Sequence, residues 1–217
     1  ARTYDRNGGA VNANQGTGAR TSAGETDLNG NAKDDTVTVA SGTLTVDGAL
    51  SNNTADLSVA NGSILAANGT IAAASINVDN GATLTTGEAE RLYDGVALNA
   101  DGTITLGGDE TIGDLSGSGT IANNGNDLTV NQTSDQGFNG NLTGEGGLAK
   151  QGEANLTLGN GSDFTGAANV NEGTLTISGA LATDTINVAN GATLTATAAD
   201  LLSDGATLTA DGTVNLG

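Results

Sequence analysis

The chain lacks several residue types on which enzymes and small secreted domains depend. Its 217 residues include no Cys, His, Pro, Met or Trp. Without Cys there is no disulfide framework and no thiolate metal site, and without His there is no Ser-His-Asp triad or imidazole metal ligand. A chain without Cys also suits export in an unfolded state through an oxidising space, although it identifies no redox compartment.

Aromatic residues are almost as scarce, at 2% of the chain, or two Tyr and two Phe. A globular core of this length usually relies on aromatic side chains for buried area. Here the apolar residues are Leu, Val, Ile and Ala, and they are spread evenly in twos and threes. This supply suits a stack of thin coils, because each layer then needs only a few aliphatic side chains.

Basic residues are also few, with 6 Lys and Arg against 25 Asp and Glu, which gives a net charge of −19. This balance argues against nucleic acid and anionic membranes as partners, because both require a basic patch. The acidity either keeps an exposed protein soluble or binds divalent cations. No stretch reaches the roughly 18 apolar residues of a transmembrane helix, and no signal peptide stands at residue 1. If the protein is secreted, we expect the signal to have been removed.

The most informative feature that is present is an internal duplication. Residues 76–107 and 186–217 align without a gap, 110 positions apart, and 20 of the 32 aligned positions are identical. Repetition of short strand-like units indicates an array that grows in one direction. Function is then expected to depend on length and side surface.

Short alternating segments fill the chain from Thr36 onward. Thr36–Val39 and Thr43–Val46 are typical, and Gly, Asn and Asp separate such segments, which recur about 17 to 28 residues apart. Alternation broken by turn residues predicts strands with Leu, Ile or Val inside and Thr, Ser or Asn outside. We therefore predict an all-β fold, a parallel β-helix over residues 36–217. A β-sandwich of hairpins is the alternative, because Asn-Gly and Asp-Gly turns also favour hairpins.

Two segments depart from this pattern. Residues 87–93 and their copies 197–203 are rich in Ala, Glu and Leu, so each is predicted to form one helical turn at a corner. Residues 1–35 have few aliphatic side chains and are interpreted as an N-terminal arm or linker. If this arm is ordered, either the body of the same chain or a neighbouring copy must hold it.

Residues 148–177 carry a longer motif, LAKQGEANLTLGNGSDFTGAANVNEGTLTI. It resembles the passenger-associated transport repeat of Gram-negative autotransporters, and the INV-x-NGATL blocks are similar to other coils of such passengers. The matching residues are Leu148, Lys150, Gly152, Leu156, Thr157, Leu158, Phe164, Thr165, Gly166, Val170, Asn171, Gly173, Thr174 and Leu175. Ala154-Asn155 departs from the family's usual Gly-Thr. The resemblance covers about residues 37–217 and implies a right-handed parallel β-helix displayed on, or released from, the outer membrane. It implies no ligand or catalytic residue.

One segment has oxygen ligands in a loop-like pattern. Asp27, Asn29, Asn31, Asp34 and Asp35 surround an early glycine, Gly30. Such a pattern could hold Ca²⁺, but the spacing is not that of an EF-hand and no Glu closes the loop. The alternative is a solvated turn that ends the arm. No other cofactor is predicted.

The remaining chemistry-bearing residues favour structural roles. The adjacent acidic pairs, Asp34-Asp35 and Asp109-Glu110, form no obvious acid–base dyad, because neighbours on a strand point to opposite faces. Tyr93 with Arg91 could stack on a sugar, but packing at a corner is the simpler interpretation. Phe138 and Phe164 are interpreted as core or corner residues.

Together these observations predict a non-enzymatic, extracellular or outer-membrane-displayed β-helix. Its expected roles are adhesion, self-association or service as a surface stalk, with a cell-surface receptor, a glycan or a second copy as partner. One alternative is a subunit that polymerises end to end, because the second copy stops at Gly217 without a polar cap. The other is a polysaccharide-active β-helix enzyme, which would need clustered carboxylates.

Overall fold

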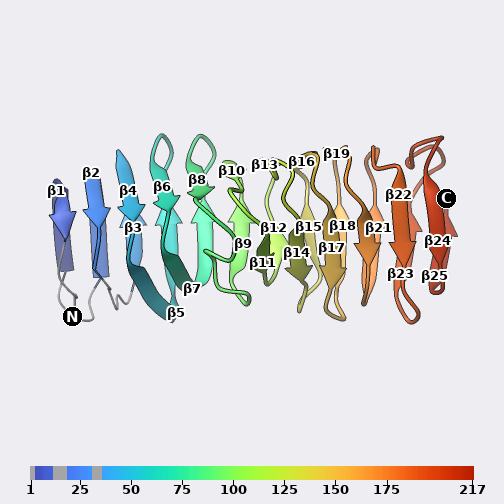
Figure 1. The fold of residues 1–217 in the computed structure, drawn as a ribbon, viewed down its shortest axis with the longest axis horizontal. Coiled ribbons are helices and arrows are strands. Elements are labelled where there is room, and N and C mark those ends of the chain that lie inside the picture. The colour runs from blue at the N-terminus through green and yellow to red at the C-terminus, as the bar shows by residue number, and fades with distance from the viewer. Residues whose placement is uncertain (1–2, 12–18, 31–35) are drawn as a thin grey trace.

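The computed structural model describes residues 3–11, 19–30 and 36–217, and in these ranges the chain forms strands and no helices. The strands stack in parallel as a β-solenoid of about ten turns, so the predicted parallel β-helix is confirmed. Figure 1 shows the elongated column, with the two chain termini at opposite ends. Every strand pair is parallel, which excludes the alternative sandwich of antiparallel hairpins.

The strands are short, and most span two to four residues. Their bounds are β1 Thr3–Val11, β2 Ala19–Leu28, β3 Val37–Val39, β4 Thr43–Val46, β5 Ala49–Val59, β6 Ile64–Ala67, β7 Thr70–Val78, β8 Thr83–Thr86, β9 Ala97–Ala100, β10 Thr103–Thr105, β11 Glu110–Ile112, β12 Leu115–Ser116, β13 Thr120–Ala122, β14 Leu128–Asn131, β15 Gln136–Phe138, β16 Asn141–Gly144, β17 Leu148–Gln151, β18 Asn155–Leu158, β19 Asp163–Phe164, β20 Ala168–Val170, β21 Thr174–Ile177, β22 Thr185–Val188, β23 Thr193–Ala196, β24 Thr207–Ala210 and β25 Thr213–Leu216.

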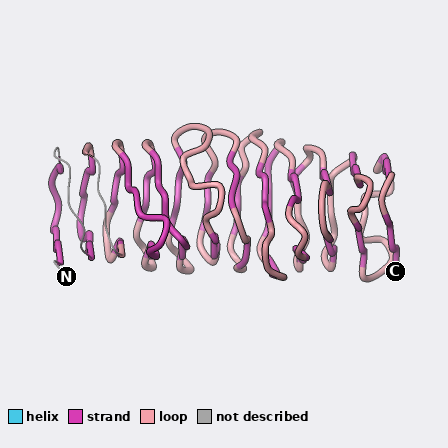
Figure 2. The backbone as a smooth tube through the Cα atoms, turned by 90° about the horizontal axis from the view of Figure 1, so that it is seen from below, coloured by secondary structure: helices cyan, strands magenta, loops and turns pink. Residues whose placement is uncertain are grey.

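Pairing between successive coils divides the column into three sides. Side A consists of β3, β5, β7, β9 and β12, continued by β15, β18, β21, β23 and β25. Side B consists of β4, β6, β8, β10, β13, β16 and β19. Side C consists of β11, β14, β17, β20, β22 and β24, and the first halves of β5 and β7 precede it. Figure 2 shows the loops that connect one side to the next.

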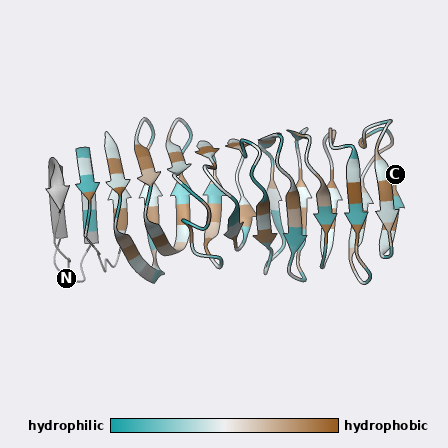
Figure 3. Cartoon of the chain, viewed as in Figure 1, coloured by the Kyte–Doolittle hydropathy of each residue, from teal (hydrophilic) through white to brown (hydrophobic). Residues whose placement is uncertain are grey.

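The core is a continuous aliphatic column inside these sides. Buried and partly exposed residues alternate along the strands, as in the pattern of β8 and β21, so inward Leu, Ile and Val stack on their counterparts one coil away. On side B the buried stack contains Leu44, Leu65, Leu84, Ile104, Ile121 and Leu142. Figure 3 shows hydrophobic segments along the column from β4 to the C-terminal end. The sequence-based assignment of inward and outward residues is therefore confirmed.

The two copies of the duplication lie on different sides of the column. In the first copy, residues 75–78 of β7 lie on side A and β8 lies on side B. In the second copy, β22 lies on side C and β23 lies on side A. Both copies nevertheless form the same turn, with Ala82 N 2.8 Å from Asp79 O and Ala192 N 3.0 Å from Ala189 O. The same local sequence therefore produces the same strand–turn–strand unit on different sides.

The described part of residues 1–35 belongs to the same column. Arg20–Ser22 of β2 pair with β3, and Thr26–Leu28 of β2 pair with β4. Strand β1 pairs with β2 in parallel. Of the two supports considered for this segment, the body of the same chain therefore holds residues 19–28.

The helical turns predicted at residues 87–93 and 197–203 are wrong. Glu90 and its copy Asp200 have φ values of +52° and +59°, in the left-handed region, where a right-handed helical turn cannot continue. The next residues instead direct Leu92 and Leu202 inward, and each forms an isolated parallel bridge to the preceding coil. Closure of the coil therefore overrides the helix propensity of Ala, Glu and Leu.

Several corners require glycine because two coils approach closely there. A Cβ atom added to Gly69 would lie 1.8 Å from the carbonyl oxygen of Gly48, and one added to Gly119 would lie 1.9 Å from that of Gly102. The glycines of Asn68-Gly69 and Ser118-Gly119 thus permit the coil spacing of about 4.8 Å.

Candidate interaction surface

Side B presents two uncharged rows to solvent, which together we name the threonine face. The first row contains Thr43, Ile64, Thr83, Thr103, Thr120 and Asn141. The second row contains Thr45, Ala66, Thr85, Thr105, Ala122 and Thr143. Each residue lies beside its counterpart one coil away, about 4.8 Å distant. None of these twelve side chains is charged, although the protein has a net charge of −19.

The hydroxyl groups of the threonine face are available to an external partner. Within the part of the chain that the structure describes, none of the eight Thr hydroxyls in the two rows has a hydrogen bond to another residue. The rows on the other sides are partly linked internally. On side A, Thr176 Oγ1 donates to Asn155 Oδ1 at 2.8 Å, and on side C, Asn187 Nδ2 donates to Asn169 Oδ1 at 2.8 Å.

Many acidic side chains lie at the corners, where they connect one coil to the next. Five Asp carboxylates accept a backbone N–H from a residue 17 to 20 positions further along the chain. The five pairs are Asp101 with Ser118 N, Asp109 with Asp127 N, Asp114 with Thr133 N, Asp127 with Gly147 N, and Asp135 with Asn155 N. Part of the acidity is therefore structural, because these carboxylates satisfy corner amides that no strand partner reaches.

Asp114 makes the most extensive of these corner contacts. Burial raises the pKa of its carboxyl, but hydrogen bonds from the hydroxyls and backbone N–H groups of Ser134 and Thr133 together outweigh burial. The net effect is a pKa below 3.8. These contacts therefore stabilise the fold above pH 3.8, and the stabilisation is lost as the pH falls through the lower pKa of the folded state.

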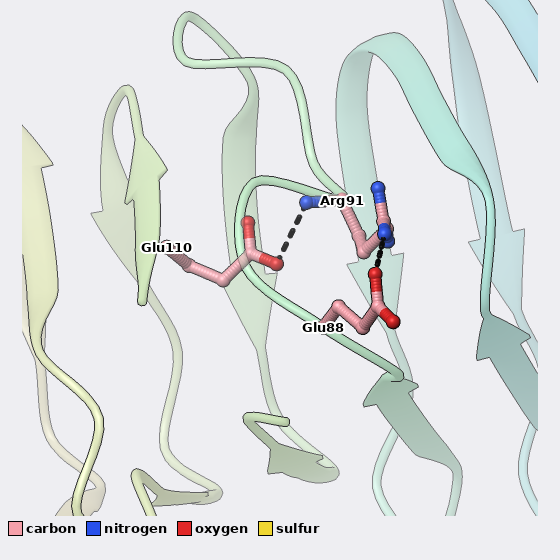
Figure 4. A network of polar contacts seen from close by, with 3 residues as sticks. All are labelled: Glu88, Arg91 and Glu110. Atoms are coloured by element: carbon pink, nitrogen blue, oxygen red, sulfur yellow. Dashed lines mark hydrogen bonds and ion pairs between the residues drawn. The ribbon is translucent and has the colours of Figure 1, made fainter. Parts of the chain in front are cut away.

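Glu110 is a buried carboxylate at the start of a strand. It begins β11, and Figure 4 shows its side chain directed at the backbone of Arg91. Its carboxylate accepts Arg91 N at 2.9 Å and Leu92 N at 3.1 Å. Burial raises the pKa of Glu110 above 4.5, the two N–H groups partly oppose this, and Glu90 raises it further. Because the folded pKa is raised, protonation between pH 4.5 and that pKa favours the folded state.

The side chains of the adjacent residues Asp109 and Glu110 point in opposite directions, as the alternation of side chains along a strand requires. Asp109 is exposed and binds Asp127 N, while Glu110 points inward. The two carboxylates therefore serve different structural roles and do not face a common space. The second acidic pair, Asp34-Asp35, lies outside the described residues.

Lys150 occupies an inward position in a stack of aliphatic residues on side C. Its register neighbours are Val130 and Val170, and its side chain is fully buried. The ammonium donates to the carbonyl oxygens of Gln151 at 2.9 Å, Gly152 at 2.8 Å and Glu172 at 3.1 Å. Burial lowers the pKa of Lys150 below 10.5, and the Glu172 carboxylate opposes this shift. The Lys of the 148–177 motif thus satisfies three corner carbonyls.

The predicted calcium ligands are only partly described. Asp27, at the end of β2, and Asn29, just beyond it, are both exposed. Asn31, Asp34 and Asp35 lie outside the described residues, so the calcium loop stays a prediction. Among the described residues, no group of three or more His, Cys, Asp or Glu side chains is placed to hold a metal ion.

The aromatic residues lie as the simpler interpretations predicted. Phe138 and Phe164 are fully buried, which confirms that they belong to the core. Tyr93 is 45% exposed, and a Cβ added to Gly95 would meet its ring at 2.8 Å, so the ring packs against the corner. Arg91 forms an ion pair with the exposed Glu88 (Figure 4).

Comparison with known proteins adds no relative. No protein-family model, no curated protein and no solved structure matches the chain. Within the described ranges, no helix has the length and apolar character to span a membrane. A function for this chain must therefore follow from the column and from the chemistry of its sides and corners.

The corner contacts of Asp114 predict a pH-dependent stability difference. Asp114→Asn removes the carboxylate acceptor and is expected to lower the free energy of unfolding at pH 7 by about 1 kcal/mol, because solvent screens the site. The difference from wild type should shrink as the pH falls below 3.8. Urea unfolding of both proteins at several pH values measures this. An equal difference at pH 7 and at pH 2.5 would contradict it.

Removal of the buried ammonium is expected to cost more. Lys150→Met keeps a long side chain but leaves three carbonyls without a donor, so we expect a loss of about 3 kcal/mol in urea unfolding. Arg91→Met is the matched control, because it removes the only other basic residue after position 33, which pairs with the exposed Glu88. The control should change stability by about 0.5 kcal/mol or less. Equal effects of the two substitutions would show that the Lys150 contacts contribute little.

Proposed function

We propose that this chain is a non-enzymatic passenger segment of the autotransporter kind, displayed outside the cell, where it serves adhesion, self-association or a stalk. The parallel solenoid supports this proposal, and so does the motif at residues 148–177. The aliphatic and aromatic members of the motif, Leu148, Leu156, Leu158, Phe164, Val170 and Leu175, are all buried. The motif therefore describes the core of stacked coils, as a scaffold repeat would.

The observation that carries the proposal is the threonine face. It presents two rows of uncharged side chains over six strands. No described residue forms a hydrogen bond with the Thr hydroxyls of these rows. A partner that lies along the column meets Thr hydroxyls on five of these six strands. Many weak contacts then add up through multivalency, and no single deep pocket is required.

The corner carboxylates support a non-catalytic role. Asp101, Asp109, Asp114, Asp127 and Asp135 bind backbone amides of the next coil, and Glu110 binds two more from inside. A general acid and a general base must instead face a shared substrate position.

The proposal predicts that charge on the threonine face abolishes adhesion. Beads coated with the purified protein are tested for aggregation with one another and for attachment to cultured cells and immobilised neutral glycans. Thr83→Glu with Thr103→Glu places two carboxylates on adjacent coils of side B, and we expect at least a tenfold loss of attachment. The charge repels an acidic partner, and its hydration must be removed on contact.

A matched control exists on side A. Thr174 and Thr193 also lie on adjacent coils, so Thr174→Glu with Thr193→Glu introduces the same charge at the same spacing. This control should attach like wild type. If wild-type beads bind nothing, or if both double variants bind equally, the threonine face is not adhesive. Electron micrographs of the free protein separate isolated rods from end-to-end filaments.

A further inference from the structure

The duplication places one Asn-Gly turn in two different environments. Asn80-Gly81 and Asn190-Gly191 each occupy the centre of a β-turn, and both glycines have positive φ, at +79° and +87°. Both asparagines are exposed. On the C-terminal side the environments match, because the corners of Gly102 and Gly212 pack against the two turns in the same way.

On the N-terminal side the environments differ. The turn at residues 60–63 lies against Asn80-Gly81, where Asn61 Nδ2 donates to Asn80 O and Gly62 N donates to Gly81 O at 3.1 Å. A Cβ added to Gly81 would lie 2.5 Å from Asn61 Nδ2. The preceding coil therefore covers the first turn.

The turn at Asn190-Gly191 is not covered in this way, because the second copy of the duplication lies on different sides of the column from the first copy. The preceding corner there is the shorter segment 171–173. Nothing lies within 4 Å of a Cβ added to Gly191. Within the described chain, no hydrogen bond reaches the side chain of Asn190, the amide of Gly191 or its carbonyl. These backbone and side-chain groups are therefore free to change conformation.

We propose that Asn190 is a site of spontaneous deamidation that reacts faster than Asn80, Asn68 and Asn124 in the turns compared with it. The backbone nitrogen of Gly191 attacks Cγ of Asn190 and loses its proton to water. The new N–Cγ bond closes a succinimide as the Cγ–Nδ2 bond breaks, and the leaving nitrogen takes a proton from water and departs as ammonia. Water then opens the ring at one of its two carbonyls, which gives aspartate or isoaspartate.

Two further Asn-Gly turns, at residues 68–69 and 124–125, are restrained at the reacting groups. Gly69 N donates to Val46 O at 2.6 Å, and Asn68 Nδ2 donates to Asp47 Oδ1 at 2.8 Å. Gly125 N donates to Asn123 Oδ1 at 3.2 Å, and Asn124 Nδ2 donates to Leu106 O at 3.2 Å. Cyclisation at either turn must first break these bonds.

The product changes the corner between β22 and β23. Each event adds one negative charge, and the isoaspartate form adds one methylene to the main chain at that corner. The reaction is independent of the proposed adhesion, because it needs only water and the folded chain.

Incubation of the folded protein at pH 7.4 and 37 °C, followed by peptide mass spectrometry, tests the proposal. Asp79→Ala makes residues 76–85 identical to 186–195, so a rate difference between Asn80 and Asn190 then reports environment alone. We expect Asn190 to react roughly 5 to 30 times faster than Asn80, the factor that one or two ordinary hydrogen bonds provide. The difference should disappear in urea, where both segments are unfolded.

A second variant tests the cause. Asn61→Ala in the Asp79→Ala protein removes the covering amide and should raise the rate at Asn80 toward that at Asn190. The proposal is overturned if Asn80 and Asn190 react equally fast in the folded protein, or if Asn68 or Asn124 reacts faster than Asn190.

Discussion

Parallel hydrogen bonding between successive coils is the constraint on which the rest of this structure depends. Each strand must lie over its counterpart about 4.8 Å away, so every position in a coil meets the same position in the next. Inward aliphatic residues then form continuous stacks, outward threonines form rows, and the corners come too close for a Cβ at Gly69 and Gly119. Composition follows from this geometry: many small and β-branched residues, and few aromatics.

The corners of such a column leave backbone N–H and C=O groups without strand partners, because the strands that form the sides end there. This chain meets the need with charged groups of both signs. Asp114 binds amides from outside, Glu110 binds amides from inside, and Lys150 binds three carbonyls. Much of the charge thereby lies at corners, while the threonine face of side B carries none, up to the exposed Asp163 of β19. The separation of charged corners from the uncharged threonine face supports a role in lateral contact.

The sequence predicts the repeating features well because they are local. Alternation at Thr43–Val46 and Thr83–Thr86 identifies strands with their inner and outer faces, and Asn-Gly dipeptides identify turns. It does not predict features that depend on the neighbouring coil. Lys150 and Glu110 are polar residues in inward positions, and only the stack reveals their partners. The helical turn expected at residues 87–93 fails for the same reason, because coil closure determines the conformation there.

The shift of the duplication by one side is the most direct test of this account, since it depends on the register of every intervening coil. The chain has no Cys, so the paired substitutions Thr176→Cys and Thr195→Cys can be read without background. These residues lie on adjacent coils of side A, at a spacing that suits a disulfide of roughly 4.4–6.8 Å between Cα atoms. The account predicts rapid intramolecular disulfide formation by this pair. Failure of this pair, with formation instead between Ala182→Cys and Thr195→Cys, would place β23 on side B and contradict the register.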